Sequence, residues 1–295
     1  MKKLKHAILN ILTLGSYKRR KKPSNLENYI KDIRELTLNY QTKELQKKHK
    51  NPLNKFGKKC FSQSDEDGIT IEILKRIGCI ENGCFAEFGP GDGMENNTLI
   101  LKSLGWKGFW IGGENLSIKY KSNEKFSFIK DFISLKNIIE LTLKSKKKIN
   151  CDDLDVISFD LDGNDLFLVD ELLKNNLKPK LFIVEYNGKF PPPIKWSINY
   201  NEKHIWDGSD YYGASLASFN ELFEKNDYKL VCCNAHTGSN AFFIKKEYLK
   251  LFDDVPTDIE DIYVAPRYFL HNVYGSYSFS HPQSVKTVNK IFSEN

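Results

Sequence analysis

Two absences limit what this chain of 295 residues can be. It has no apolar run that approaches the roughly 20 residues of a membrane-spanning helix. Its six cysteines form no C-x-x-C pair and no spacing typical of zinc ligands, and several lie in apolar segments, where a thiol packs as a small hydrophobic side chain. We therefore expect reduced, structural cysteines and a cytoplasmic protein.

An excess of positive over negative charge is also missing from most of the chain, although the net charge of the whole is +6. Residues 1–50 carry 14 lysines and arginines against four acidic residues, whereas residues 51–295 carry 30 against 34. The basic character therefore belongs to an N-terminal arm, and the main part is mildly acidic. This balance argues against nucleic acid as a partner of the main part.

The arm begins with an apolar run at 7–14 between the lysine-rich residues 2–5 and the basic block Lys18–Lys22. It lacks the small-residue cleavage site of a signal peptide. Two interpretations remain open. The run could be an ordinary solvated helix, or a basic amphipathic helix that lies on an anionic membrane and holds the protein at its inner face. Apolar residues at helical spacing predict a second helix over 24–50.

Glycine is concentrated in one stretch, Cys84–Asn97, with the sequence C-F-A-E-F-G-P-G-D-G-M-E-N-N. A short apolar strand there breaks into Gly89, Gly91 and Gly93. Glycine permits positive φ angles and lets the backbone approach a ligand closely. An α/β sheet holds a nucleotide-like cofactor at its carboxyl edge with a strand, a glycine turn and the beginning of a helix, in that order.

Two classes of cofactor compete for this stretch. A dinucleotide motif, G-x-G-x-x-G, needs a third glycine where this chain has Met94. Glu87 gives instead the pattern E-x-G-x-G-x-G, which resembles the first motif of S-adenosylmethionine-dependent methyltransferases. In that motif the acid and the glycine backbone hold a cationic ligand that bears an amino acid.

Strands and helices alternate along the rest of the chain. We interpret Lys144–Lys148 as a solvated loop and 188–212, rich in proline and aromatic residues, as a long functional loop. The last two strands read as an antiparallel hairpin. Apolar segments predict strands at 85–88, 108–111, 126–132, 154–159, 181–184, 229–233 and 241–244, and helices at 69–77, 99–104, 135–143, 167–173 and 215–225.

This order predicts a doubly wound, mostly parallel α/β sheet with a terminal antiparallel hairpin, the seven-stranded topology of class I methyltransferases. We expect a basic helical arm at 1–55, a Rossmann-like domain at 56–250, and a C-terminal extension at 251–295 that packs on the domain.

Acidic residues follow several of the predicted strands. Glu114 lies 21 positions after Gly93, close to the spacing of about 20 residues at which a second-strand acid meets ribose hydroxyls. Asp131, after the third strand, could meet an adenine amino group or be a solvated loop residue. Asp160 and Asp162 share one parity of the fourth strand, and Glu185 ends the next, so these acids should converge. Asp165 could instead cap a helix.

Four stretches together resemble FkbM-like S-adenosylmethionine-dependent methyltransferases, a group associated with O-methylation of sugars and other hydroxylated metabolites. They are F-S-Q-S-D-E-D-G (61–68), F-A-E-F-G-P-G-D-G-M-E-N-N-T (85–98), S-F-D-L-D-G-N-D (158–165) and I-V-E-Y-N (183–187). The resemblance spans about residues 60–245. One departure is Glu114, where related sequences tend to have aspartate.

The resemblance implies that the cofactor is S-adenosylmethionine and that the reaction methylates a hydroxyl of a sugar, nucleotide-sugar or surface-glycan precursor, as in polysaccharide biosynthesis. It implies a base among Asp162, Glu185 and His236, the last in the loop between the final two strands. The implied cofactor-binding residues are Gln63, Glu87, Gly89, Gly91, Asp92, Gly93, Asn97, Glu114, Asp131 and Asp160.

Two interpretations of the converging acids stay open. One is a divalent cation, magnesium or manganese, with Asp160, Glu185 and Asn187 as its ligands, and the other is a metal-free site in which one carboxylate is the base and the others hydrogen-bond to sugar hydroxyls. Carboxylates that converge repel one another unless one is protonated or a cation lies among them. Hard oxygen ligands suit these ions. Two other classes of function stay open: an NAD(P)-dependent nucleotide-sugar oxidoreductase, and a non-catalytic scaffold recruited to a membrane. The sequence does not specify the oligomeric state.

Overall fold

A computed structural model describes residues 25–267 and 284–293 of the chain. The apolar run at 7–14 and its basic flanks lie outside these residues. The chain divides into two compact units, residues 1–43 and 44–295, and the boundary falls within helix α2 (Asn25–Lys48). The helix predicted over 24–50 is therefore confirmed, and residues 44–55 group with the larger unit.

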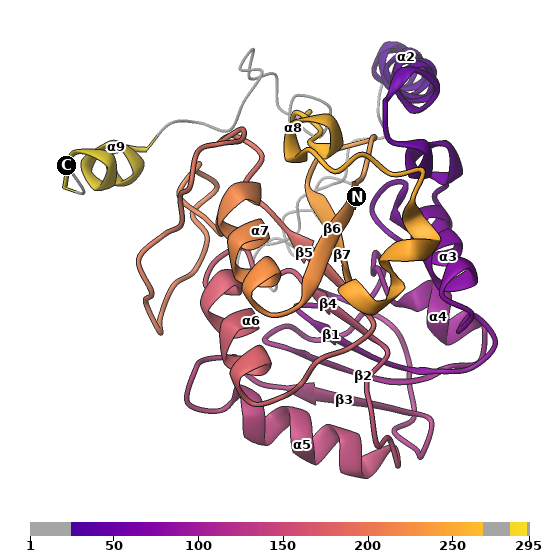
Figure 1. The fold of residues 1–295 in the computed structure, drawn as a ribbon, viewed down its shortest axis with the longest axis vertical. Helices are drawn as coiled ribbons and strands as arrows, with labels where there is room; N and C mark the ends of the chain where they lie inside the picture. The colour runs from indigo at the N-terminus through magenta and orange to yellow at the C-terminus, as the bar shows by residue number, and fades with distance from the viewer. Residues whose placement is uncertain (1–24, 268–283, 294–295) are drawn as a thin grey trace, which may run out of the picture. The chain divides into compact units, whose positions relative to one another are not determined.

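The larger unit is built on a seven-stranded sheet of order β3-β2-β1-β4-β5-β7-β6 (Figure 1). Strand β7 runs antiparallel to both neighbours, and the other pairs are parallel. This confirms the predicted sheet with its antiparallel hairpin. The strands are β1 (Cys84–Phe88), β2 (Lys107–Gly112), β3 (Phe126–Lys130), β4 (Val156–Phe159), β5 (Leu181–Glu185), β6 (Tyr228–Cys233) and β7 (Asn240–Lys245).

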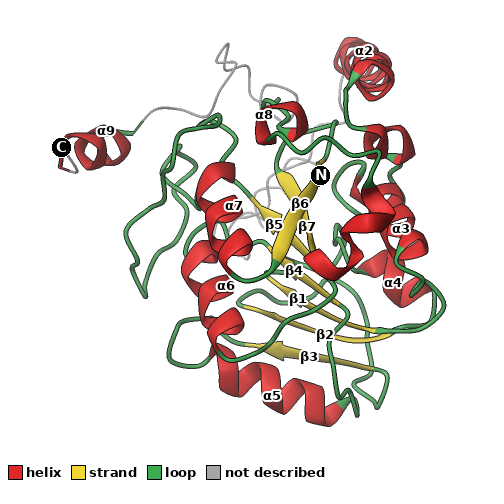
Figure 2. Ribbon diagram, in the orientation of Figure 1, coloured by secondary structure: helices red, strands yellow, loops and turns green. Residues whose placement is uncertain are grey.

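Helices cover both faces of this sheet, as a doubly wound fold requires (Figures 1 and 2). Because both faces are covered, the central strands are buried on both sides and read as continuous apolar runs. Helices α5 (Ile138–Lys148), α6 (Asp165–Lys174) and α7 (Leu216–Lys225) lie along one side, and α3 (Glu66–Arg76) and α4 (Leu99–Ser103) lie on the other.

Helix α5 corrects one prediction, because Lys144–Lys148 is helical and not a loop. Buried Ser145 and Ile149 continue the helical spacing of buried Ile138 and Leu141. Because the buried residue at position 145 is a serine, a search for apolar residues at helical spacing does not detect this part of the helix. The lysines at the end of α5 also complement the negative end of the helix dipole.

Short helices complete the described chain: η1 (Pro52–Phe56), η2 (Lys246–Phe252), α8 (Ile259–Ile262) and α9 (Val285–Ser293). The segment after α8 contacts the end of β5, since the Tyr186 hydroxyl donates to the Val264 carbonyl at 2.8 Å and the Tyr263 hydroxyl donates to that of Gly188 at 2.7 Å. The described residues include no helix that is both long and apolar enough to span a membrane. All six cysteines are free thiols, as predicted.

Candidate functional site

The glycine turn after β1 needs glycine for two different reasons. Gly89 has φ +85°, and a Cβ there would lie 1.6 Å from the carbonyl oxygen of Asp160 on the neighbouring strand. Gly91 has φ +51°, and none of the described residues places an atom within 4 Å of its Cβ position. The lack of a side chain at Gly89 therefore lets the backbones that follow β1 and β4 lie close together, and Gly91 borders open space.

Glu87 supports the turn from inside. Its side chain is buried and accepts hydrogen bonds from the backbone N–H of Asn97 at 3.0 Å, and from the N–H and hydroxyl of Thr98. The Trp110 indole N–H donates to the Thr98 hydroxyl at 2.9 Å. Burial raises the pKa of Glu87 to about 7, although these hydrogen bonds oppose the shift. Glu87 therefore fixes the shape of the turn from below.

Asn97 is buried in the same way, with its amide donating to the Ser158 hydroxyl at 3.1 Å. Asp92 instead lies at the surface and joins the turn to the loop after β2. Its carboxylate accepts from the Met94 N–H at 3.0 Å and from the Ser117 hydroxyl at 2.9 Å. The turn is therefore held on both sides while Gly91 is exposed.

The predicted nucleoside-binding acids lie at the carboxyl ends of the next two strands. Glu114 and Asp131 are both exposed, and the Asp131 N–H donates to the Gly112 carbonyl at 3.0 Å. The negative charge of Glu114 contributes to the raised pKa of Asp162, so these two acids interact electrostatically. Gln63 is exposed in the segment before α3, where its carbonyl accepts from the Lys59 ammonium.

The strand register places one residue per strand in a row along the carboxyl edge. Phe88 pairs with Phe159, Phe159 with Val184, and Val184 with Ala241. The residues that come next at this edge share one face of the sheet. They are Gly89, Asp160, Glu185 and Asn240, the last paired directly with Glu185.

Three carboxylates converge in this row, as the strand parity predicts. Asp160, Asp162 and Glu185 each offer an oxygen, and these oxygens lie within 4.8 Å of one another. Burial, followed by the charges of neighbouring acids, raises the pKa of Asp160 and of Glu185 well above the usual range. The same causes raise the pKa of Asp162 to about 6. Asp160 and Glu185 hydrogen-bond to each other, so one of them carries a proton when no ligand is present.

Asp165 supports the loop that carries two of these acids. It is buried and accepts from the backbone N–H groups of Leu161 and Gly163, each at 2.8 Å. These bonds hold Asp162 in a left-handed conformation with φ +52°. Asp165 therefore fixes the loop and does not contact the open edge.

Asn187 lies just beyond Glu185, and its side chain binds the long loop. Its amide donates to the carbonyls of Asp210 and Tyr212 at 2.9 and 3.0 Å, and its oxygen accepts from the Lys189 N–H. The structure therefore brings together two of the three expected cation ligands, Asp160 and Glu185, with Asp162 as a third carboxylate. It assigns the Asn187 side chain to the loop.

The long loop folds back on the acidic segment. Asn164 exchanges two hydrogen bonds with the backbone of Asn201, at 2.8 and 3.1 Å. This contact brings His204 beside Asp162, whose carbonyl accepts a hydrogen bond from the imidazole. Burial lowers the pKa of His204, and its Nε2 finds no hydrogen-bond partner among the described residues. Sequence reasoning missed His204 because it lies about 40 positions from the acids that it joins.

His236 is placed differently from His204. It is half-buried in the 234–239 loop, where its N–H donates to Asp65 at 3.1 Å. Burial lowers its pKa, and Arg267 lowers it further while Glu66 opposes the shift. The charges that act on His236 are therefore those of Arg267, Glu66 and Lys59. Those that act on His204 are Lys286, Asp165 and Asp207.

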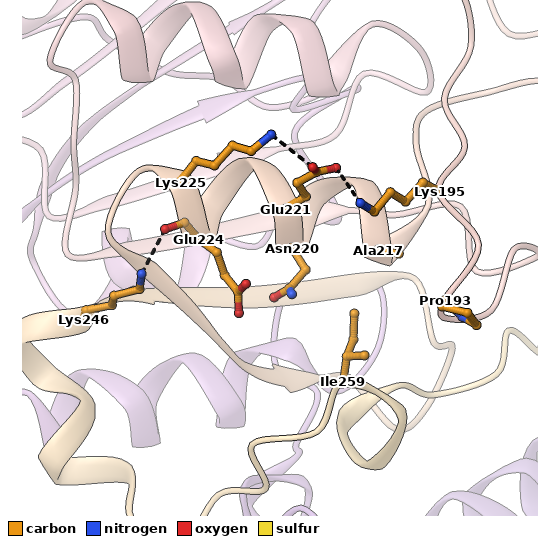
Figure 3. A pocket seen from close by; sticks show the side chains of 9 residues that line it. All are labelled: Pro193, Lys195, Ala217, Asn220, Glu221, Glu224, Lys225, Lys246 and Ile259. Carbon is orange, nitrogen blue, oxygen red and sulfur yellow. Dashed lines mark hydrogen bonds and ion pairs between the residues drawn. The ribbon is translucent and has the colours of Figure 1, made fainter.

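A surface hollow of about 500 Å³ lies apart from these residues (Figure 3). Two of its lysines pair with one acid, since Glu221 binds Lys195 at 3.1 Å and Lys225 at 3.0 Å. None of the predicted site residues lines it. Its lining consists of Pro193, Lys195, Ala217, Asn220, Glu221, Glu224, Lys225, Lys246 and Ile259.

No protein-family model matches this chain, and no curated protein matches it. Several solved methyltransferases resemble it at low identity. One from the mycinamycin biosynthetic pathway, solved with Mg, SAH and mycinamycin VI, is 12% identical with a TM-score of 0.29, over 41% of this chain and 32% of its own. The match therefore spans about a third of that enzyme.

Two further structures are similarly distant. Magnesium protoporphyrin IX methyltransferase from Synechocystis, with bound SAH, is 9% identical with a TM-score of 0.35, over 60% of this chain and 80% of its own. Human N-acetylserotonin methyltransferase, with SAM, is 9% identical with a TM-score of 0.35, over 59% and 50%. At these values the likeness concerns the fold, and the assignment of a function rests on the geometry of this chain.

Proposed function

We propose that this protein is an S-adenosylmethionine-dependent O-methyltransferase. The observation that supports this most is the E-x-G-x-G-x-G turn beside a row of acids at the carboxyl edge. Buried Glu87 holds this turn by hydrogen bonds, and the space next to Gly91 is open. In an open α/β sheet, this edge is where ligands bind. The turn fits the cofactor because backbone approach is unobstructed at Gly91 and an exposed carboxylate, Glu114, follows β2.

When bound, S-adenosylmethionine supplies a methyl group already activated by the sulfonium charge. The chain has two remaining tasks, to align the acceptor oxygen and to remove one proton. Asp162, with a pKa of about 6, is ionised at neutral pH and can accept that proton. Glu185 lies within the same cluster, and His204 beside Asp162 is a second candidate base.

A divalent cation would serve the same cluster. Asp160, Asp162 and Glu185 supply hard oxygen ligands of the kind that magnesium and manganese prefer. A cation there would relieve the repulsion among the three acids. It would also lower the pKa of an acceptor hydroxyl, so that a weak base suffices.

The acceptor that we propose is a hydroxyl of a sugar, nucleotide-sugar or surface-glycan precursor. Aromatic side chains of the long loop, among them Trp206 and Tyr211, offer apolar faces of the kind that stack on sugar rings. Mass spectrometry after incubation with S-adenosylmethionine and candidate sugar nucleotides tests this directly, through the gain of one methyl group.

The competing cofactor class is tested by thermal unfolding. We expect S-adenosylhomocysteine to raise the melting temperature and NAD(P) to leave it unchanged, because Met94 stands where the dinucleotide motif needs glycine. A shift with NAD(P) alone would favour an oxidoreductase. A shift with neither would favour a non-catalytic protein.

Glu114→Ala is expected to weaken binding of S-adenosylhomocysteine by about 1–3 kcal/mol, because two ribose hydroxyls lose their charged acceptor. Isothermal titration calorimetry measures the change. Glu124→Ala is the control, since Glu124 is an equally exposed acid that precedes β3. Equal affinity of the Glu114 variant and the wild type would remove Glu114 from the site.

The N-terminal arm supports a separate proposal, peripheral attachment to an anionic membrane at the cytoplasmic face. Residues 2–22 carry eight lysines and arginines and no acid. Near an anionic surface each contributes about 1 kcal/mol, and the contribution falls with salt. We expect the full chain to sediment with phosphatidylserine vesicles at low salt and a variant lacking residues 1–22 to stay in solution. Equal partitioning of the two would exclude the arm as an anchor.

A further inference from the structure

Asn240 is the one residue of the acidic row that no sequence motif marks. It is the first residue of β7, it is 4% exposed, and it pairs with Glu185 across the strands. The Tyr186 N–H donates to the Ser239 carbonyl at 2.8 Å, so Glu185 and Asn240 form the adjacent, non-hydrogen-bonded pair. Residues of such a pair have Cα atoms about 4.5 Å apart and side chains on one face. The Asn240 side chain therefore starts beside that of Glu185.

A buried carboxylate sets the orientation of the Asn240 amide. Its Nδ2 donates to Glu66 Oε1 at 3.1 Å. The opposite orientation would place the amide oxygen against a carboxylate oxygen, so nitrogen and oxygen are assigned by chemistry. Glu66 Oε1 also accepts from Asn234, which follows β6, at 3.0 Å. Glu66 thus binds the nitrogen of the amide and leaves Oδ1 as the atom that it does not hold.

Asn240 Oδ1 is buried and has no hydrogen-bond partner anywhere in the described part of the chain. A buried acceptor left unpaired has lost its bonds to water without compensation. Its neighbours in the row, Asp160, Asp162 and Glu185, offer acceptors as well. The main charges acting on Asp160 and Glu185 are those of other acids, not of lysine or arginine. The proton of this cluster lies between Asp160 and Glu185, so the three acids offer Asn240 Oδ1 no donor.

We infer that Asn240 Oδ1 is a ligand of a divalent cation held by Asp160, Asp162 and Glu185. The inference rests on the proposed function, since it completes the cation site of the same carboxyl edge. An amide oxygen beside carboxylates is a common ligand for magnesium and manganese. Glu66 acts through Asn240 by fixing which atom of the amide faces the cation.

Titration of the full-length, chelator-treated protein with Mn²⁺ tests this inference. Electron paramagnetic resonance reports the free ion, and no acceptor needs to be known. We expect Asn240→Leu to raise the Kd for Mn²⁺ about 10- to 100-fold, as the loss of a site-forming contact does. Asn240→Asp keeps an oxygen and should bind Mn²⁺ at least as tightly as the wild type. Asn240→Ala gives the same comparison if leucine is not accommodated.

Asn96→Leu is the matched control. Asn96 is also buried, its Nδ2 donates to the Pro90 carbonyl at 3.0 Å, and its Oδ1 likewise finds no partner among the described residues. Its side chain hydrogen-bonds to Pro90 and to none of the three acids, so Mn²⁺ binding should not change. Loss of Mn²⁺ affinity in both variants would point to a general disturbance and overturn the assignment.

The other outcomes separate this inference from the proposed function. Equal Mn²⁺ affinity of Asn240→Leu and the wild type would remove Asn240 from the ligand set and leave the cation site. Binding of S-adenosylhomocysteine without saturable Mn²⁺ binding would overturn the cation site and leave the methyltransferase proposal. If Asn240→Leu weakened S-adenosylhomocysteine alone, the amide would contact the cofactor and the inference would be wrong.

Discussion

Gly89→Ala is expected to destabilise the protein by at least about 4 kcal/mol or to prevent folding, the largest effect of any single methyl group that we predict. The new Cβ would lie 1.6 Å from the carbonyl oxygen and 2.7 Å from the carbonyl carbon of Asp160. Neither atom can move freely, because the Asp160 N–H donates to the Phe88 carbonyl at 3.0 Å and holds β4 to β1. Urea unfolding followed by circular dichroism measures the loss.

Gly105→Ala separates this collision from backbone strain. Gly105 has φ +91°, close to the +85° of Gly89, but no described atom lies within 4 Å of its Cβ position. Its substitution should cost only the strain of a left-handed residue, about 1–2 kcal/mol. If the two variants lost equal stability, strain alone would explain Gly89. A folded Gly89→Ala variant should also fail to bind S-adenosylhomocysteine, since the turn would be displaced.

Asp162→Asn is expected to stabilise the ligand-free protein at pH 7.5 and to reduce methyl transfer by at least about 100-fold, the usual effect of losing a general base. The pKa of Asp162 is raised from 3.8 to about 6 in the folded state. Between these pH values the folded state binds more protons than the unfolded state, so stability falls as the pH rises. Above pH 6 the loss is complete and amounts to at most about 3 kcal/mol, at 1.4 kcal/mol per pH unit.

Asparagine removes this charge and also tolerates the left-handed φ of +52° at this position. The variant should therefore gain stability relative to the wild type at pH 7.5, and the gain should vanish as the pH approaches 4. Urea unfolding at several pH values measures both. Asp152→Asn, at an exposed loop position, should change stability by less than about 0.5 kcal/mol throughout. A gain independent of pH, or a loss at pH 7.5, would contradict the electrostatic account.

The pattern of the sequence predicted the strands and the meeting of Asp160 with Glu185 for simple reasons. Strands covered on both faces must be apolar throughout, and parallel strands bring their carboxyl ends to one edge. Adjacent strands then place residues of the same parity side by side. The meeting of Asp160 and Glu185 depended only on one strand and its neighbour, and the structure shows it.

Other features of the site depend on contacts that one-dimensional spacing does not contain. Glu87 lies inside the turn because Asn97 and Thr98, ten and eleven positions later, fold back to donate to it. Asn187 serves the long loop, and His204 reaches Asp162 only because Asn164 binds that loop. Each of these roles is set by a hydrogen bond between segments that a periodic pattern treats as unrelated.

The reversed direction of β7 has a consequence for changing what this protein acts on. The parallel strands reach the carboxyl edge only with their last residues. Because β7 is antiparallel, its first residues and the short 234–239 turn before it lie at this edge. Most of this turn is buried and held by side-chain hydrogen bonds of Asn234, Thr237 and Ser239, so His236 is its partly exposed position. A library of substitutions at His236 would therefore vary this edge of the sheet while the glycine turn after β1 stays intact, which makes it a practical starting point for redirecting specificity.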